Sequence, residues 1–81
     1  MTASFNDIGR WLEEGKMKGA THVIVARDTW DNENYPVYVL PSDDVKEVVD
    51  GYAKKQDRVE EVYNLSMDIE EQLSSTRAMN L

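Results

Sequence analysis

The chain has 81 residues, no cysteine, and sixteen acidic residues against nine basic ones, which gives a formal charge of −7 at neutral pH. This length allows one domain with a modest core, and the lack of cysteine excludes disulfides, thiolate catalysis and cysteine-ligated zinc. The negative charge disfavours direct binding to nucleic acid or to anionic membranes. It serves either solubility or an acidic face that occupies the nucleic-acid channel of a partner protein.

The first predicted element is a helix that begins at about Phe5. Ser4 and Asp7 resemble a capping box, with an acid at the third helical position. An apolar stripe at helical spacing follows. It consists of Phe5, Ile8, Trp11 and Leu12. Gly15 and Gly19 predict the end of this helix, because glycine adopts the left-handed conformation of a C-cap without strain.

Two strands are predicted next. The run "THVIVAR" at 21–27 is β-branched and almost continuously apolar, which predicts a strand covered on both faces. The run "YPVYVL" at 35–40 predicts a second strand, with Pro36 at its start or on an edge because proline has no backbone donor. The connection at 28–34 is rich in turn formers. The simplest arrangement is an antiparallel pair.

A second helix follows Pro41, with Ser42 as its N-cap and two acids in the first turn. Its apolar stripe has spacing i, i+3, i+4 and i+7. This stripe consists of Val45, Val48, Val49 and Tyr52. Residues 51–56 are either a break or a bent continuation, and a second capping pattern at Asp57 and Glu60 favours a break.

A third, long helix is predicted over residues 58–77. Its seam consists of Val59, Val62, Leu65 or Ser66, Ile69 and Leu73. Tyr63 and Met67 lie beside this seam at i and i+4, where they either close the core of the monomer or form a subunit interface. A two-stranded sheet is marginally stable alone, and its free edges favour pairing with a second copy.

The predicted fold is therefore α+β, in the order α-β-β-α-α, with a two-stranded antiparallel hairpin packed on helices. We expect one domain over residues 1–81, with a short flexible tail at its C-terminal end. We also expect a homo-oligomer, in the first place a dimer. No apolar run is long enough to cross a bilayer, and the N-terminal residues do not have the pattern of a signal peptide, which predicts a cytoplasmic protein.

Evidence for catalysis is sparse in this sequence. His22 is the only histidine, and within a buried strand it serves either as a hydrogen-bonded core residue or as a general base. No recognisable nucleophile motif or glycine-rich phosphate loop is present. The acids Asp28, Asp31 and Glu33 do not have the spacing of a calcium-binding loop and more simply solvate a turn or neutralise Arg27. We therefore predict a non-enzymatic protein without a metal or cofactor.

The segment "RDTWDNENY" at 27–35 is the strongest candidate for a binding site. Arg27 can donate a planar fork of hydrogen bonds to a phosphate or carboxylate, and the aromatic residues nearby offer flat faces for stacking. The predicted set for a nucleotide-like ligand is Arg27, Asp28, Thr29, Trp30, Asn32, Tyr35 and Tyr38, with further polar groups at Asp31 and Asn34. In the alternative interpretation, Trp30 folds back as a lid on the core and Arg27 pairs with Asp28 or Asp31.

The stretches "GATHVIVARDTWDNENYPVYV" at 19–39 and "DRVEEVYNLSMDIEEQL" at 57–73 resemble a group of small uncharacterised proteins of phages and bacteria. The similarity covers residues 5–80 and implies no catalytic residues. It implies a compact phage accessory protein, which would act in the host cytoplasm.

Accessory proteins of this kind act by binding. The first prediction is an anti-defence factor that sequesters a nucleotide-like immune signalling molecule. The alternative is an acidic protein-binding inhibitor of a host defence, CRISPR or nucleic-acid-handling protein, which imitates nucleic acid or docks an apolar helix face. A small enzyme that uses His22 with an acidic neighbour is ranked last.

Overall fold

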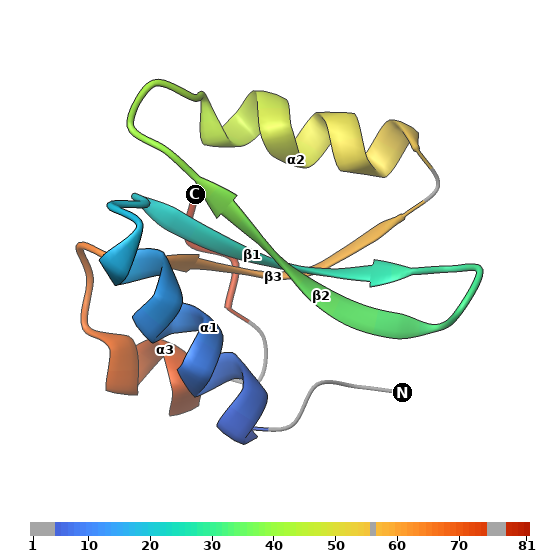
Figure 1. Ribbon diagram of the computed structural model, residues 1–81. Coiled ribbons are helices and arrows are strands. Elements are labelled where there is room, and N and C mark those ends of the chain that lie inside the picture. The colour runs from blue at the N-terminus through green and yellow to red at the C-terminus, as the bar shows by residue number, and fades with distance from the viewer. Residues whose placement is uncertain (1–4, 56, 75–77) are drawn as a thin grey trace.

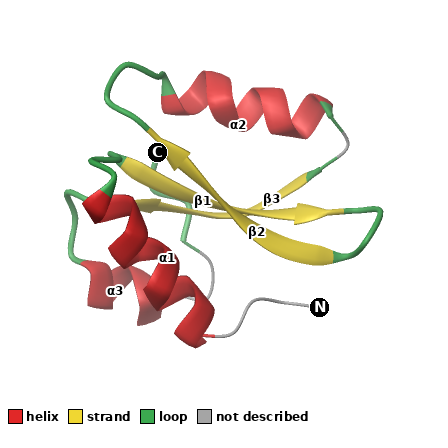
Figure 2. Ribbon diagram, in the orientation of Figure 1, coloured by secondary structure: helices red, strands yellow, loops and turns green. Residues whose placement is uncertain are grey.

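The computed structural model describes residues 5–55, 57–74 and 78–81, which form three helices and one antiparallel sheet in the strand order β2-β1-β3 (Figure 1). The elements in chain order are α1 (Phe5–Met17), β1 (His22–Asp28), β2 (Glu33–Val39), α2 (Val45–Lys54), β3 (Arg58–Asn64) and α3 (Ile69–Ser74). Helix α2 covers one face of the sheet, and α1 and α3 lie on the other (Figure 2). The α+β class predicted from the sequence is confirmed, but the sheet has three strands rather than two.

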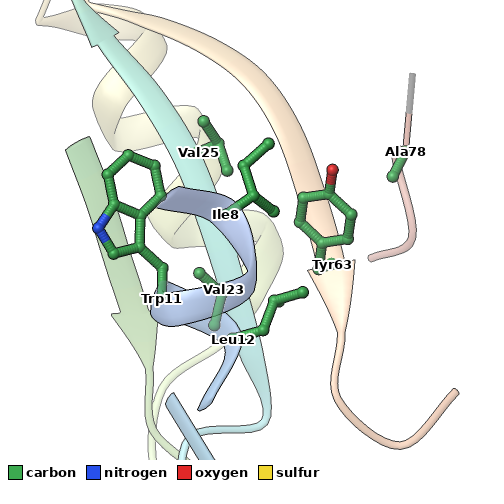
Figure 3. Packing of buried hydrophobic residues seen from close by; sticks show 7 residues of the cluster. All are labelled: Ile8, Trp11, Leu12, Val23, Val25, Tyr63 and Ala78. Carbon is green, nitrogen blue, oxygen red and sulfur yellow. The ribbon is translucent and has the colours of Figure 1, made fainter. Parts of the chain in front are cut away.

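Strand β1 is the centre of the fold, and residues 23–26 are all buried. Val23 and Val25 face α1, where they pack with Ile8, Trp11 and Leu12 and with Tyr63 of β3 (Figure 3). Ile24 faces α2, in a second cluster with Val39 and Val62. A strand between two layers of helix needs apolar side chains on both faces, which explains the continuous apolar run.

The end of α1 is a Schellman motif centred on Gly19. Gly19 has φ +75 and donates to the Lys16 carbonyl at 3.1 Å, and Ala20 donates to the Gly15 carbonyl at 2.9 Å. Gly15 lies within the helix, where a Cβ atom would be 2.6 Å from Val23 Cγ2. Gly19 therefore ends the helix as predicted, whereas Gly15 lets α1 approach β1. The predicted cap at Ser4 lies outside the described residues.

Helix α2 begins after Asp44, not after Ser42 as predicted. The Asp44 carboxylate accepts a hydrogen bond from the Lys46 N–H at 2.9 Å, which is the bond of an N-cap. Val45, Val48 and Val49 pack against the cluster of Ile24, Val39 and Val62, so their predicted apolar stripe is confirmed. The helix ends at Lys54, and the predicted break before residue 57 is also confirmed.

The predicted third helix over residues 58–77 is wrong in its first part, because residues 58–64 form strand β3, and a helix is found only at Ile69–Ser74 of the described residues. A bulge explains the misleading pattern: Val25 pairs with Glu61 and Ala26 pairs with Val59, so Glu60 is an extra residue in β3. The bulge places Val59 and Val62 on the same face although they are three residues apart. Their i, i+3 spacing is helical in appearance and arises from an irregular strand.

The C-terminal residues of the sequence complete the sheet. The Val62 N–H donates to the Ala78 carbonyl at 2.8 Å, and the Asn80 N–H donates to the Val62 carbonyl at 3.0 Å. These bonds place residues 78–80 parallel to β3 along its outer edge, and the Ala78 side chain is buried in the core. The segment predicted as a tail therefore contributes these residues to the fold. Oligomerisation stays a prediction.

The outer edge of β2 is unpaired in the part of the chain that the structure describes. Val62 of β3 uses its backbone N–H and carbonyl for bonds to residues 78–80 on its outer side, so its partner Ile24 does not bond toward β3. The odd-numbered residues of β1 therefore bond toward β3 and the even-numbered ones toward β2. Pro36 pairs with Val25, which places the nitrogen of Pro36 on the outer edge, in agreement with its prediction as an edge residue.

None of the helices among the described residues is long and apolar enough to span a membrane.

Candidate functional site: the hairpin tip and the sheet-end cleft

The turn between β1 and β2 is held by its own polar groups. Asp28 accepts two hydrogen bonds, one from the Asn32 N–H to its carbonyl at 2.7 Å and one from the Trp30 N–H to its side chain at 2.8 Å. Asn32 has φ +60, a left-handed conformation that asparagine tolerates. Residues 28–33, called here the hairpin tip, therefore form a turn with a defined backbone.

Trp30 projects from the hairpin tip with 91% of its surface exposed. The alternative interpretation, in which this indole is a lid on the core, is therefore wrong. Asp31 and Glu33 are also exposed, and Asp28 lies at the base of the turn. The hairpin tip thus combines one large exposed aromatic side chain with three carboxylates.

Arg27 lies on the α1 side of the sheet, and its side chain is only 23% exposed. Its Nε atom is 3.1 Å from the Glu60 carboxylate, an ion-pair contact whose alignment is too poor for a hydrogen bond. The alternative pairing with Asp28 or Asp31 is thus not what the structure contains. Glu60, the extra residue of the β3 bulge, therefore neutralises Arg27. The prediction of a helix over residues 58–77 did not bring Glu60 beside β1.

Tyr35 and Tyr38 face opposite sides of β2. The Tyr35 hydroxyl donates to the Asp57 carboxylate, and its ring centroid is 6.2 Å from that of Tyr52 on α2. The Tyr38 hydroxyl donates to Glu14 on α1 at 2.7 Å. Burial raises the pKa of both hydroxyls, helped by these hydrogen bonds, and that of Tyr38 reaches about 12.

The predicted ligand-binding residues are therefore distributed over several surfaces. Arg27 lies on the α1 side of the sheet, Tyr35 on the α2 side, and Trp30 beyond the strands. Tyr38 pairs with Val23, near the other end of β1. Asp28, Thr29 and Asn32 belong to the turn. One chain thus brings only the residues of the hairpin tip together, and a ligand role for the full set stays a prediction.

No group of three or more histidine, aspartate or glutamate side chains is placed to hold a metal ion among residues 5–55, 57–74 and 78–81. The carboxylate of Asp28 is engaged by the Trp30 N–H within its own turn. This bond agrees with the view that the acids of the segment solvate and shape the turn.

A second candidate site lies at the end of the sheet opposite the hairpin. A cleft of about 610 Å³ separates the end of α1 from the turn after β3 and is called here the sheet-end cleft. It is lined by Lys16, Ala20, Thr21, His22, Asn64, Leu65 and Ser66. Of these residues, only His22 is a candidate functional residue from the sequence. Asn64, Leu65 and Ser66 are not, because the sequence does not predict that β1 pairs with β3.

The proposed interface residues Tyr63 and Met67 do not share a surface. Tyr63 is 2% exposed and belongs to the core beneath α1, with its hydroxyl 3.0 Å from the Glu61 carboxylate. Met67 is 48% exposed and precedes α3. The predicted i, i+4 proximity required a helix, whereas Tyr63 lies in strand β3 and Met67 lies in the turn that follows it. Of the two, only Met67 offers apolar surface to a partner.

No family model, no curated protein and no solved structure matches this chain. Its function is therefore inferred from the geometry of the hairpin tip and the sheet-end cleft.

Proposed function

We propose that the protein acts without catalysis, by docking the hairpin tip into a pocket on a partner protein. The exposure of Trp30 carries this proposal. An indole left in water forgoes the large favourable free energy of burying its apolar surface, and tryptophan is enriched among residues that dominate binding free energies at interfaces.

The local order of the turn supports the same proposal. Two hydrogen bonds to Asp28 and the left-handed conformation of Asn32 define the backbone on both sides of Trp30. A side chain presented on a preformed turn loses less conformational entropy on binding than one on a mobile loop.

The charge of the hairpin tip indicates the kind of partner. Asp28, Asp31 and Glu33 lie in the same turn as Trp30, and Arg27, which precedes this turn, is already paired with Glu60. We therefore propose a partner with an apolar pocket rimmed by lysine or arginine, since complementary charge accelerates association and selects the partner. A host defence protein or a nucleic-acid-handling protein with a basic channel has this chemistry, and occupancy of the channel would inhibit it.

Sequestration of a nucleotide-like molecule at the hairpin is the weaker proposal. A phosphate would have to compete with Glu60 for Arg27. It would also meet three carboxylates at the hairpin tip. A stacked base could use Trp30, but Tyr35 and Tyr38 lie on opposite sides of β2 and cannot enclose the same ring.

The test starts with a photo-crosslinking amino acid at position 30 and, as a matched control, at Met17, which is 87% exposed on α1. A host protein crosslinked from position 30 but not from position 17 is purified, and its affinity is measured by calorimetry. Trp30→Ala should weaken binding at least about 30-fold, the equivalent of a 2 kcal/mol hot spot. Met17→Ala should leave the affinity unchanged.

Charge complementarity is tested on the same purified pair. Asp31→Asn should slow association and flatten its dependence on salt, while dissociation changes little. Equal affinity of wild type and Trp30→Ala for the crosslinked protein would show that the hairpin tip is not the docking surface. Tight binding of a nucleotide that Trp30→Ala abolishes would instead favour sequestration.

A further inference from the structure

The end of the sheet opposite the hairpin tip carries exposed apolar side chains. The Thr21 N–H donates to the Val39 carbonyl at 2.7 Å, and the Thr21 carbonyl accepts from the Leu65 N–H at 2.9 Å. The turn after α1, the end of β2 and the turn after β3 therefore meet at this end (Figure 1). Three exposed residues of this end, called here the apolar end, are Met17 (87%), Leu40 (42%) and Met67 (48%). Apolar residues gathered on one surface of a small domain indicate that a partner covers it.

The apolar end presents a protruding side chain next to a hollow. Met17 is the last residue of α1 and directly follows Lys16, which lines the sheet-end cleft together with Ala20 and Leu65. The cleft measures about 610 Å³. Methionine is unbranched and flexible, so it adapts to an irregular apolar hollow. A protrusion and a hollow side by side suit a two-fold interface, because each copy places its protrusion in the hollow of the other.

Opposite charges on the two sides of the apolar end favour a second copy as the occupant. Lys16 lies at the end of α1, and Asp68 follows Met67 and precedes α3. Neither charge forms an ion pair within the described part of the chain. Because α1 and α3 lie on the same face of the sheet (Figure 2), a two-fold axis perpendicular to the sheet places the end of α1 in one copy opposite the start of α3 in the other. A lysine then faces an aspartate on both sides of the axis.

The two ends of the sheet differ in their capacity to meet a copy of themselves. The hairpin tip carries three carboxylates, Asp28, Asp31 and Glu33, so two hairpin tips repel each other. The apolar end carries both signs of charge around its exposed side chains, and a surface of this kind is complementary to itself. The hairpin tip therefore suits a foreign partner, and the apolar end suits a second copy of the chain.

We infer that two copies of the chain associate through the apolar end, with Met17 of each copy in the sheet-end cleft of the other and Lys16 of each copy beside Asp68 of the other. Both hairpin tips then lie far from the interface, so the dimer presents two docking surfaces and does not depend on docking by Trp30. An interface confined to one end of an 81-residue domain is smaller than the ~800 Å² per partner of a standard complex, so we expect a dissociation constant on the order of 10 μM.

Sedimentation equilibrium from low to high micromolar concentration tests the dimer. Met17→Asp should raise the dissociation constant at least tenfold, because it places a carboxylate against the apolar cleft. Trp30→Asp is the matched control, since it replaces an exposed apolar side chain at the opposite end, and it should leave the constant unchanged. Both side chains are exposed, and circular dichroism checks that both variants fold. A wild type that stays monomeric, or a Met17→Asp variant that dimerises as tightly as the wild type, would overturn the inference.

Charge reversal tests the two-fold arrangement. Lys16→Glu and Asp68→Lys should each dimerise more weakly than the wild type, because each homodimer brings like charges together on both sides of the axis. In an equimolar mixture both contacts again join opposite charges, so the heterodimer should be at least tenfold tighter than either homodimer.

The Asp68 carboxylate also accepts from the Glu71 N–H at 3.2 Å, so circular dichroism checks that Asp68→Lys keeps its helix content. If it does not, Asp68→Asn, which retains an acceptor, takes its place. The double variant Lys16→Glu/Asp68→Asn should then dimerise more tightly than Lys16→Glu alone. A mixture of folded variants, or a double variant, without this gain would overturn the arrangement.

Discussion

The side-chain amide of Gln72 pairs with the backbone of Asn64 through both of its polar atoms. The Asn64 N–H donates to Oε1 at 2.8 Å, and Nε2 donates to the Asn64 carbonyl at 2.9 Å. The same amide donates to the Asp68 carbonyl at 3.1 Å and accepts from the Asn80 side chain at 2.9 Å. One buried residue therefore connects the end of β3, the start of α3 and the C-terminal segment.

We predict that Gln72→Ala lowers the free energy of unfolding by about 2 to 4 kcal/mol, because it leaves several polar groups near Asn64 without partners. Glu70→Ala, on the exposed side of the same helix, should change it by less than about 0.5 kcal/mol. Urea unfolding followed by circular dichroism measures both. Similar values for the two variants would mean that solvent replaces the bonds of Gln72.

Two glycines of α1 should respond to alanine with opposite signs. Gly15→Ala gains helix propensity but places a Cβ atom 2.6 Å from Val23 Cγ2, so we expect a net loss of about 1 to 3 kcal/mol. Gly9→Ala meets no atom within 4 Å and should stabilise the protein by about 0.5 to 1 kcal/mol. Thermal unfolding of the pair checks this. A stabilising Gly15→Ala would show that α1 can shift away from β1 at little cost.

Alkaline pH should destabilise the protein partly through Tyr38. Burial and the hydrogen bond to Glu14 raise the pKa of this hydroxyl to about 12, against an ordinary value of 10.0. The unfolded chain therefore loses the proton first, and the stabilising contribution is present in full below pH 10 and disappears as the pH rises to about 12.

Tyr38→Phe removes that contribution. Its free energy of unfolding should fall less steeply between pH 10 and 12 than that of the wild type, by up to about 1.4 kcal/mol per pH unit. Tyr35 and Tyr63, whose pKa values are also raised, should keep part of the slope. Urea titrations at fixed pH values provide the comparison, and identical slopes would mean that Tyr38 ionises freely in the folded protein.

The edge of β2 gives a prediction about self-association. Pro36 places a residue without an N–H at the middle of the outer edge, which weakens pairing with another strand. Pro36→Val restores the donor and should increase the mass measured by light scattering at high micromolar concentration.

The homo-oligomer predicted from the sequence is tested in the same experiment. A dimer in the wild type would have to use a surface other than a fully paired β2 edge, and Met67→Asp should weaken it if Met67 is part of the interface. A wild type that stays monomeric at high micromolar concentration would exclude the predicted homo-oligomer.

The sequence predicts those elements whose side chains repeat with a regular period. The continuous apolar run of β1 and the stripe of α2 reflect burial on two faces and on one, and both predictions are confirmed. Strand β3 was missed because its bulge puts Val59 and Val62 on one face at a helical spacing. Local pattern alone does not reveal an extra residue that only pairing with β1 defines.

The same distinction applies to the candidate functional residues: their local features could be predicted from the sequence, and those that depend on strand pairing could not. Turn formers around Trp30 indicate an exposed loop, whereas the partner of Arg27 and the opposite orientations of Tyr35 and Tyr38 depend on the register of the sheet. Gln72 carried no signal at all, because its partners lie at the ends of separate elements.

The two tryptophans lie in opposite environments, with Trp11 in the core and Trp30 in water. The intrinsic fluorescence of the protein therefore contains two separable signals. Trp11 should emit at shorter wavelength, resist quenching by acrylamide and change when the chain unfolds. Trp30 should be quenched readily and become protected when a partner covers it. A Trp30→Phe protein would then report on folding and a Trp11→Phe protein on docking, without any attached dye.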